Sequence, residues 1–431
     1  MSRRRAGRPG PLWMLALLLI VPTPLWAAGS DGELPHLLLT VAAMLVAGKL
    51  LGEGAERLGL PSVLGELVAG VLLGASVLGV VPAPGESSAE MLRVLAELGV
   101  ILLLFEVGLE TDLREMSKVG GAALAVACVG VVVPFALGYF YWAWLPHPVT
   151  SDGGDLRTVA IFVGATLTAT SVGITARVLG DLGRMDTPEA RIILGAAVID
   201  DIIGLVILSV VSGIAAGGTV SVAGVGTTFA VAIGFLVAAV MLGNLVIPRV
   251  ADRLLRMRVR GMVVAVSIAF ALALAALAAQ VGSALIIGAF AAGLILRGTR
   301  HHQTVEHQVQ PVAALLAPIF FVNVGAAADL RLLDPTRPGA GGILLVAGAL
   351  TLIAIGGKLV AGWGAPWARF DRLTVGTGMV PRGEVGLIFA DVGRKAGLLS
   401  DTTFSIVLLM VMATTFIAPV ALKLIFARVR R

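Results

Sequence analysis

Apolar segments long enough to cross a lipid bilayer follow one another along almost the whole chain. A transmembrane helix needs about 20 consecutive apolar residues, and short polar breaks separate many such stretches here. Of the 431 residues, 58% are hydrophobic and only 14% are charged, whereas about a quarter of the residues in a soluble domain are charged. The sequence therefore predicts an all-α polytopic membrane protein and excludes a soluble domain with a single membrane anchor.

From residue 31 onward, the apolar stretches predict thirteen transmembrane helices. Their approximate limits are 35–53, 62–80, 91–109, 120–144, 157–178, 189–214, 224–248, 261–280, 282–298, 311–328, 341–364, 372–396 and 401–427. Arg is abundant between residues 249 and 260, whereas the preceding loop, at 215–223, contains neither Arg nor Lys. Because positive residues collect in cytoplasmic loops, we expect residue 31 on the periplasmic side of the inner membrane and the C-terminus in the cytoplasm.

The N-terminal segment 1–29 has a composition of its own. A basic start, MSRRRAGRPG, precedes an apolar stretch and a group of small residues near Ala27, which is typical of a signal peptide. An extra, uncleaved N-terminal helix is the alternative. Residues 30–431 are expected to form one transmembrane domain. It contains no G-x-x-x-x-G-K-[ST] phosphate loop and one cysteine, Cys128, so we expect no bound nucleotide, no cofactor and no intrachain disulfide. The net charge of +5 reflects the loop arginines and does not indicate a nucleic-acid partner.

Three pairs of motifs, in the same order along the chain, predict two related halves. The pairs are LPSVLGELVAGVLLG (60–74) with SALIIGAFAAGLILR (283–297), FEVGLETDL (105–113) with VNVGAAADL (322–330), and TSVGI (170–174) with GEVGL (383–387). They align Gly65 with Gly288, Gly70 with Gly293, Gly108 with Gly325, and Asp112 with Asp329. Seven spans separate the members of the first pair, so the halves have opposite orientations. Inverted repeats are typical of alternating-access transporters.

Two adjacent carboxylates, Asp200 and Asp201, lie in the middle of the apolar segment LGAAVIDDIIGLVIL. One charge at bilayer depth costs roughly 3 kcal/mol or more, so such residues are rarely retained without a function. Carboxylate oxygens suit hard cations such as Na⁺ and also accept protons. A site that holds either ion in turn is the minimum device for exchange, although a purely structural ion pair is a second interpretation. Lys358 lies mid-span in LIAIGGKLVAGW and is the expected counter-charge for one of the aspartates.

Helix-breaking residues occur at matching positions of the two halves. TATSVGIT (168–175) carries small and hydroxyl residues within an apolar span, and GMVPRGEVGL (378–387) carries a proline and two charges. Broken helices at matching positions point to a binding site at the bilayer midplane. Thr170 and Ser171 are therefore candidate cation ligands, with ordinary hydroxyl bonding to the helix backbone as the alternative. Arg382 and Glu384 are expected to neutralise each other and the facing helix ends.

Three further polar residues and one histidine cluster each have more than one interpretation. Glu66 is expected near a helix end in a structural role. Glu106 is expected either to line the cavity or to pair with Arg382, and Asn323 is a similar accessory candidate. The cluster of His301, His302 and His307 reads as a solvated cytoplasmic loop, although histidines can also sense pH.

At these residues the sequence resembles the cation:proton antiporter-2 family, and within it the NapA-type bacterial Na⁺/H⁺ antiporters. The motifs that carry the resemblance are LPSVLGELVAGVLLG, TATSVGITARVL, LGAAVIDDIIGL, LAPIFFVNVG, GGKLVAG and GMVPRGEVGLI. Together they span the chain from about residue 35 to its end. Two features depart from the pattern: Glu106 stands where the family often has an apolar residue, and the signal-like N-terminus is additional.

The resemblance implies a homodimer with two crossed, broken helices and an elevator-like movement. It implies a mobile core domain (about 91–178, 189–214 and 311–427), a dimerisation domain (about 35–80 and 261–298) and a linker helix (about 224–248). Asp201 would be the principal carrier of cation and proton, and Asp200 would pair with Lys358. An Asp-Asp pair implies electrogenic exchange.

Three functions are compared on this basis. The first is exchange of Na⁺ or Li⁺ for protons, serving pH homeostasis, and the alternative on the same fold is K⁺/H⁺ antiport or K⁺ efflux. The third, an intramembrane aspartyl protease, needs two carboxylates that share a proton. Adjacent residues of one helix point about 100° apart, so the sequence favours a transporter over an enzyme.

Overall fold

The computed structural model of the chain describes residues 33–82, 87–111, 113–145, 155–215, 222–254, 259, 261–281, 285–300, 302–328, 331 and 340–429. These residues form helices joined by turns and irregular segments, without a strand among them, which confirms the all-α prediction. The helices are α2 (Glu33–Arg57), α3 (Ser62–Leu73), α4 (Ser87–Glu110), α5 (Leu113–Trp144), α6 (Leu156–Thr166), α7 (Val172–Asp181), α8 (Pro188–Ala215), α9 (Val222–Leu254), α10 (Met262–Gln280), α11 (Leu285–Arg297), α12 (His302–Ala326), α13 (Ala340–Ala361), α14 (Arg372–Gly378), α15 (Glu384–Lys395) and α16 (Asp401–Val429). The signal-like segment and the pair Asp112 and Asp329 lie outside the described residues.

The described helices differ in their length and apolar character. Six of them, α2, α5, α10, α12, α13 and α16, are long and apolar enough to cross a membrane on length and composition alone. Helix α3 is shorter than its predicted span because the chain leaves the helical conformation at Gly74, with φ −65° and ψ 167°. A Cβ at Gly74 would lie 2.8 Å from the carbonyl oxygen of Ala326, so α12 packs directly against this end. Thirteen as the number of spans stays a prediction.

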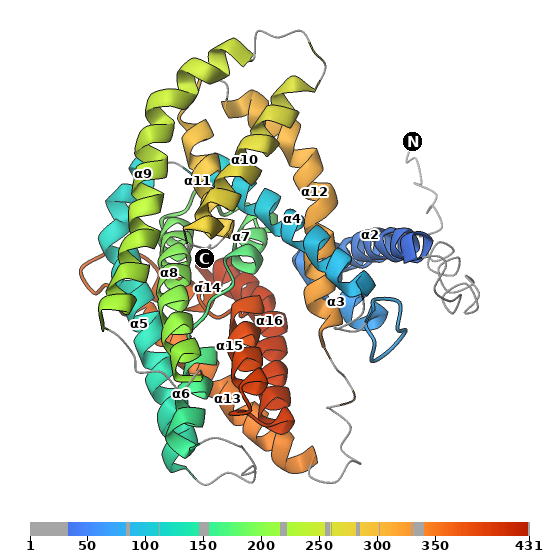
Figure 1. The fold of residues 1–431 in the computed structure, drawn as a ribbon, viewed down its shortest axis with the longest axis vertical. Helices are drawn as coiled ribbons and strands as arrows, with labels where there is room; N and C mark the ends of the chain where they lie inside the picture. Colours follow the sequence, from blue (N-terminus) through green and yellow to red (C-terminus); the bar gives the residue numbers. More distant parts are fainter. Residues whose placement is uncertain are drawn as a thin grey trace, which may run out of the picture.

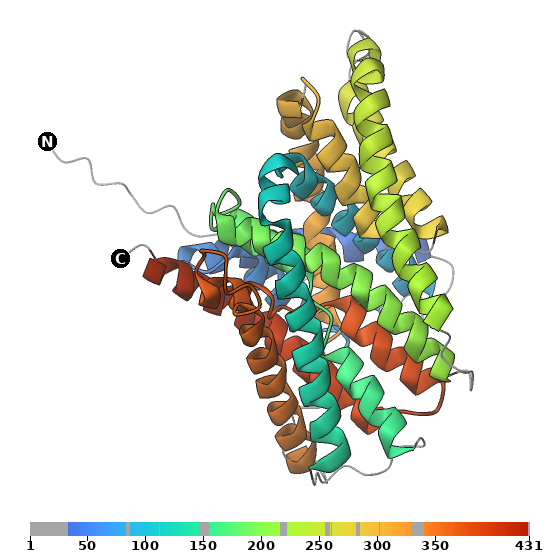
Figure 2. The same ribbon diagram turned by 90° about the vertical axis from the view of Figure 1, so that its left-hand side faces the viewer.

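The helices pack as two bundles that α9 connects along the chain (Figures 1 and 2). In the first, here called the α4 bundle, α4 packs against α11 and α12, and α2, α3 and α10 complete the group. In the second, the α8 bundle, α5 packs against α6, α8 and α13, and α14, α15 and α16 join them. Helix α9 contacts α8 on one side and α11 on the other. Helix α7 lies between the bundles, against α3 and α4 as well as α8.

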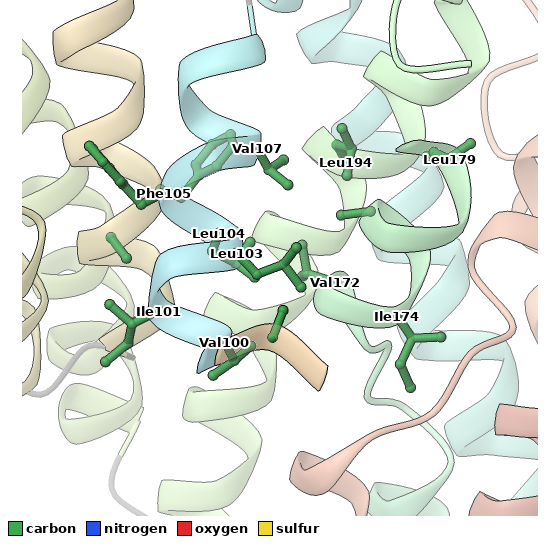
Figure 3. Close-up of a cluster of buried hydrophobic side chains, with 14 of the residues drawn as sticks. Val100, Ile101, Leu103, Leu104, Phe105, Val107, Val172, Ile174, Leu179 and Leu194 are labelled. Carbon is green, nitrogen blue, oxygen red and sulfur yellow. The ribbon is translucent and has the colours of Figure 1, made fainter. Parts of the chain in front are cut away.

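An apolar cluster fills the contact between α4 and α7 (Figure 3). Val100 and Leu103 of α4 and Val172 of α7 are all buried there. The neighbouring Gly173 also faces α4: a Cβ at that position would lie 3.4 Å from Val100 and 3.8 Å from Leu103, which is ordinary van der Waals contact. The two bundles therefore meet through close-packed apolar side chains at this point.

Glycine contacts reproduce the predicted repeat at the level of single atoms. A Cβ at Gly70 on α3 would overlap the carbonyl oxygen of Val322 on α12. The repeat partner Gly293, on α11, meets the carbonyl oxygen of Phe105 on α4 in the same way. Val322 and Phe105 are themselves partners, because they occupy the same first position of the paired motifs VNVGAAADL and FEVGLETDL.

The reciprocal contacts follow the same rule. Gly325 meets the carbonyl oxygen of Leu67, and its partner Gly108 meets that of Phe290. Near the start of each half, Gly65 meets the carbonyl oxygen of Leu51, and Gly288 meets that of Leu274. Because each close approach depends on a missing Cβ, the two halves are built from one packing scheme. The repeat predicted from sequence is therefore visible in the helix packing, while the opposite orientation of the two halves stays a prediction.

Candidate functional site

The two carboxylates lie on α8 and are enclosed by the protein. Asp200 is 1% exposed and Asp201 is 7% exposed. No membrane-crossing helix tolerates two such groups in lipid without compensation, and burial inside the α8 bundle provides a protein environment. The pair therefore sits in the interior of the molecule, as its position in the sequence predicted.

Lys358, on α13, reaches Asp200 directly. Its Nζ donates a hydrogen bond of 3.1 Å to Oδ2 of Asp200, and the lysine side chain is fully buried. The other carboxylate oxygen, Oδ1, is buried and has no hydrogen-bond partner among the described residues. A buried ion pair of this kind is balanced between Coulomb attraction and the cost of desolvation. Asp200 is therefore hydrogen-bonded to Lys358 through Oδ2, and its Oδ1 accepts no hydrogen bond from the described residues.

Two interrupted helices cross beside this pair. One interruption lies between α6, which ends at Thr166, and α7, which begins at Val172, and the other lies between α14, which ends at Gly378, and α15, which begins at Glu384. Both interruptions fall where the sequence predicted them. They leave backbone N–H and C=O groups without intrahelical partners, which are the groups that an ion or a facing segment can use.

Hydrogen bonds join the two interruptions to each other. The backbone N–H of Ser171 donates to the carbonyl oxygen of Pro381 at 2.8 Å, and Oγ1 of Thr170 donates to that of Met379 at 3.2 Å. Ser171 also caps α7, since its Oγ accepts from the backbone N–H of Ile174. A Cβ at Gly383 would lie 2.8 Å from that Oγ, so glycine at this position permits the crossing.

Arg382 lies at the second interruption and is fully buried. Its Nη1 donates to the carbonyl oxygen of Ala169 at 2.6 Å, and Nη2 donates to that of Ala354 at 3.4 Å. Ala169 follows the C-terminal end of α6, where a positive charge is favourable. The guanidinium is also close enough to Asp200 for their charges to interact. Arg382 thus compensates the first interruption, whereas the side chain of Glu384 lies outside the described residues.

The whole arrangement matches a known family of membrane proteins. The family model described as "Sodium/hydrogen exchanger, transmembrane" matches residues 41–428. The chain belongs to this exchanger family. It is 39% identical, over 96% of its length and 95% of the relative's, to the high-affinity Na⁺/H⁺ antiporter NhaS3 of Synechocystis sp.. It is 36% identical to the Na⁺/H⁺-K⁺ antiporter GerN of Bacillus cereus, over 90% of this chain and 95% of that one.

A third curated relative and a solved structure complete the comparison. The Na⁺/H⁺ antiporter of Enterococcus hirae is 31% identical over 88% of the exchanger and 95% of its own length. The sodium proton antiporter MjNhaP1 of Methanocaldococcus jannaschii has the same fold, with a TM-score of 0.68 over 92% of this chain and 97% of that chain at 17% identity. The predicted fold is therefore confirmed, while closeness to NapA-type members stays a prediction.

The exchanger does not bring every candidate residue to the aspartates. Glu106 is half-buried on α4, where it bonds with the side chain of Gln310 and neighbours Glu110 and Arg177. It does not pair with Arg382, which bonds elsewhere. Asn323 is partly buried on α12. These two accessory candidates therefore belong to helices of the α4 bundle, and Lys358, Thr170, Ser171 and Arg382 belong to the site.

The predicted loop placement of the histidines is wrong for His302 and His307, because α12 begins at His302 and both residues lie in its first turns. The Nδ1 atom of His302 lies 3.1 Å from the carbonyl oxygen of Thr299. His301 lies outside the described residues.

Two buried hydroxyls that bond to the second interruption were not singled out in the sequence analysis. Oγ1 of Thr415, on α16, donates to the carbonyl oxygen of Arg382 at 2.6 Å, and Oγ1 of Thr175 donates to that of Gly378 at 2.9 Å. At the offset of 213 that pairs TSVGI with GEVGL, Asp201 aligns with Thr414, the residue before Thr415. Thr415 supports the second interruption through its bond to the carbonyl oxygen of Arg382.

Proposed function

We propose that the chain exchanges a monovalent cation, Na⁺ or Li⁺, for protons across the inner membrane. The observation that carries the proposal is the buried pair Asp200 and Asp201, tied to Lys358 and enclosed by two crossed interruptions, in a member of the exchanger family. Two relatives named Na⁺/H⁺ antiporters match 96% and 88% of the chain. An exchanger family also favours transport over the protease alternative.

In this proposal Asp201 carries the transported ions in turn. A carboxylate binds a hard cation when ionised and loses it on protonation, so one group can couple two opposed fluxes. Thr170 and Ser171 supply oxygens at the first interruption. Asp200 stays paired with Lys358 until an ion that binds at Asp201 changes the local charge. The negative charge of Asp200, in addition to that of Asp201, supports electrogenic exchange.

The two bundles suggest how access alternates. We propose that the α8 bundle moves as the core against the α4 bundle, which serves as scaffold and dimer-forming part in a homodimer, with α9 as linker. The packing of α4 and α12 against α11 supports grouping both with the scaffold, although the sequence-based division placed them in the core. The loop charges support a periplasmic start and a cytoplasmic C-terminus.

A second candidate is K⁺ exchange on the same site. It is favoured by one observation, the likeness to a relative named a Na⁺/H⁺-K⁺ antiporter. Which cation fits depends on small differences in oxygen placement.

Proteoliposomes with a pH-sensitive dye test both candidates. A pH gradient should collapse on addition of NaCl or LiCl, and Asp201→Asn should abolish the response. Glu53→Gln, which alters an exposed carboxylate on α2, is the matched control and should respond like the unaltered protein. Exchange by Asp201→Asn at the normal rate would refute the assignment, and a response to KCl alone would favour the second candidate.

A further inference from the structure

A network of charged residues joins α7 to α3, away from the aspartate site. Glu66 of α3 is 1% exposed, and its Oε1 lies 3.6 Å from Nη2 of Arg177 on α7 and 3.9 Å from Nζ of Lys49 on α2. Its second oxygen, Oε2, is buried without a hydrogen-bond partner among the described residues. A buried carboxylate of the α4 bundle therefore faces α7, the helix that lies between the two bundles and also packs against α8.

A second carboxylate, on α7, completes the network from the other side. Oδ2 of Asp181 accepts a hydrogen bond of 2.6 Å from Oγ of Ser62, and Oδ1 lies 3.2 Å from Nε of Arg177. Nη2 of Arg177 also donates to Oγ of Ser62 at 3.2 Å. Helices α3 and α7 each contribute a carboxylate, and Arg177 of α7 contacts both of them. The network thus spans the gap rather than stabilising one helix.

The repeat shows that this network exists on one side of the molecule only. At the offsets of the first and third motif pairs, the positions of Ser62, Glu66, Arg177 and Asp181 correspond to Leu285, Ala289, Ala390 and Arg394. Arg394 is the only charged residue of the second set, and it pairs with Asp401 and stacks on Phe404 within its own bundle. The corresponding ends of α11 and α15 therefore lack the residues for an equivalent network.

Helix packing has the same asymmetry. Helix α7 packs against α4 (Figure 3) and against α3, and α16 also reaches α3. Among the described residues, the repeat partners, α15 with α11 and α12, and α8 with α11, make at most marginal contact. The bundles are therefore closed on the side of the loops at 58–61 and 182–187. Because an inverted repeat exchanges the conformations of its halves when access alternates, the opposite state requires α7 to leave α3.

We propose that Glu66, Ser62, Arg177 and Asp181 form a latch that holds the exchanger closed on this side and that must open in each transport cycle. The proposal rests on the movement of the two bundles described under the proposed function. Since the second half offers no equivalent latch, these residues bias the equilibrium between the two states toward the one seen here. Oε2 of Glu66 has no hydrogen-bond partner among the described residues, and its Oε1 lies 3.6 Å from Arg177 and 3.9 Å from Lys49. Glu66 is therefore loosely paired, and its contacts can break in each transport cycle.

The latch can be measured without transport. Val63 is fully buried, and its backbone N–H lies 3.4 Å from Oδ2 of Asp181. A Val63→Cys reporter in a Cys128→Ala background, in lipid nanodiscs, reacts with a water-soluble maleimide only when the bundles separate. Glu66→Gln should raise the labelling rate about fivefold, and Arg177→Gln should raise it at least as much, because it removes the contacts with both Glu66 and Ser62. The double variant should not exceed Arg177→Gln, since the contact between the two residues is already lost in either single variant.

Controls separate the latch from general loosening. Glu53→Gln breaks an exposed ion pair within α2 and should leave labelling unchanged. If Glu66→Gln does not fold, Ser62→Ala removes only the hydroxyl and should give a smaller increase in the same direction. Unchanged labelling in the folded variants, or additive effects of the two charges, would overturn the latch. The reporter needs no transported ion, so an unaltered protein that fails to exchange Na⁺ for protons would refute the proposed function and leave the latch result standing.

Discussion

Lys358 and Asp200 are joined by a hydrogen bond of 3.1 Å between two buried side chains, yet the second oxygen of Asp200 has no hydrogen-bond partner among the described residues. The lysine compensates the charge of the aspartate without saturating its hydrogen-bonding capacity. Asp201, the next residue, points about 100° away on an ideal helix. One carboxylate is therefore neutralised structurally, and its neighbour is oriented differently and can serve a separate purpose.

Removing the lysine should destabilise the protein more than removing the pair. Lys358→Met leaves a buried aspartate without its counter-charge, and we expect a loss of about 3–5 kcal/mol in unfolding free energy. In the double variant Asp200→Asn/Lys358→Met neither charge remains, so most of this loss should be recovered. Thermal unfolding in lipid nanodiscs provides the measurement. Equal destabilisation of the single and double variants would contradict the ion-pair account.

Competition between proton and cation gives a prediction with a definite sign. If both ions use Asp201, lowering the pH by one unit should raise the Na⁺ concentration for half-maximal exchange about tenfold in the range where the carboxylate is protonated. The maximal rate at saturating Na⁺ should change much less. Titrations with Na⁺ at several pH values, followed by the dequenching of a pH-sensitive dye in proteoliposomes, measure the half-maximal concentration and the maximal rate. A half-maximal concentration that does not depend on pH would show that the ions bind at separate groups.

The sequence was sufficient to predict the repeat, both helix interruptions and the residues that pair at the site. Their signals are local: a charge in an apolar run, a glycine at a fixed offset, a proline within a span. It was insufficient to assign α4 and α12 to a bundle, because span order does not determine which helices touch. It predicted that Arg382 would compensate a facing helix end but could not name the acceptor, the carbonyl oxygen of Ala169, since that contact depends on how two distant segments meet.

Thr415 should matter more than its neighbour in the same helix. Thr415→Val removes the 2.6 Å bond to the carbonyl oxygen of Arg382 and leaves a buried acceptor unsatisfied, at a cost of about 1–3 kcal/mol. We expect lower stability and a several-fold slower exchange, because the second interruption loses its support. Thr414→Val is the matched control, since Thr414 donates only to carbonyls of its own helix, at Met410 and Val411. Similar loss of exchange in both variants would assign the effect to the helix rather than to the bond.

The glycine contacts predict that equivalent substitutions in the two halves cost the same. Gly70→Ala and Gly293→Ala each place a Cβ against a carbonyl oxygen of a facing helix, and overpacking of this kind costs at least about 1–3 kcal/mol. Gly356→Ala is the control: no atom lies within 4 Å of a Cβ there, and alanine favours a helix over glycine by up to about 1 kcal/mol.

Thermal unfolding of the three variants tests whether the two substitutions have the same cost. We expect the midpoint to fall in Gly70→Ala and Gly293→Ala by similar amounts and to stay level or rise in Gly356→Ala. The reason is geometric, since each half uses its glycine to bring one helix onto the backbone of another at the same point of the repeat. If only one of the two paired variants were destabilised, the packing of the halves would differ despite their shared sequence pattern, and the repeat would describe topology alone.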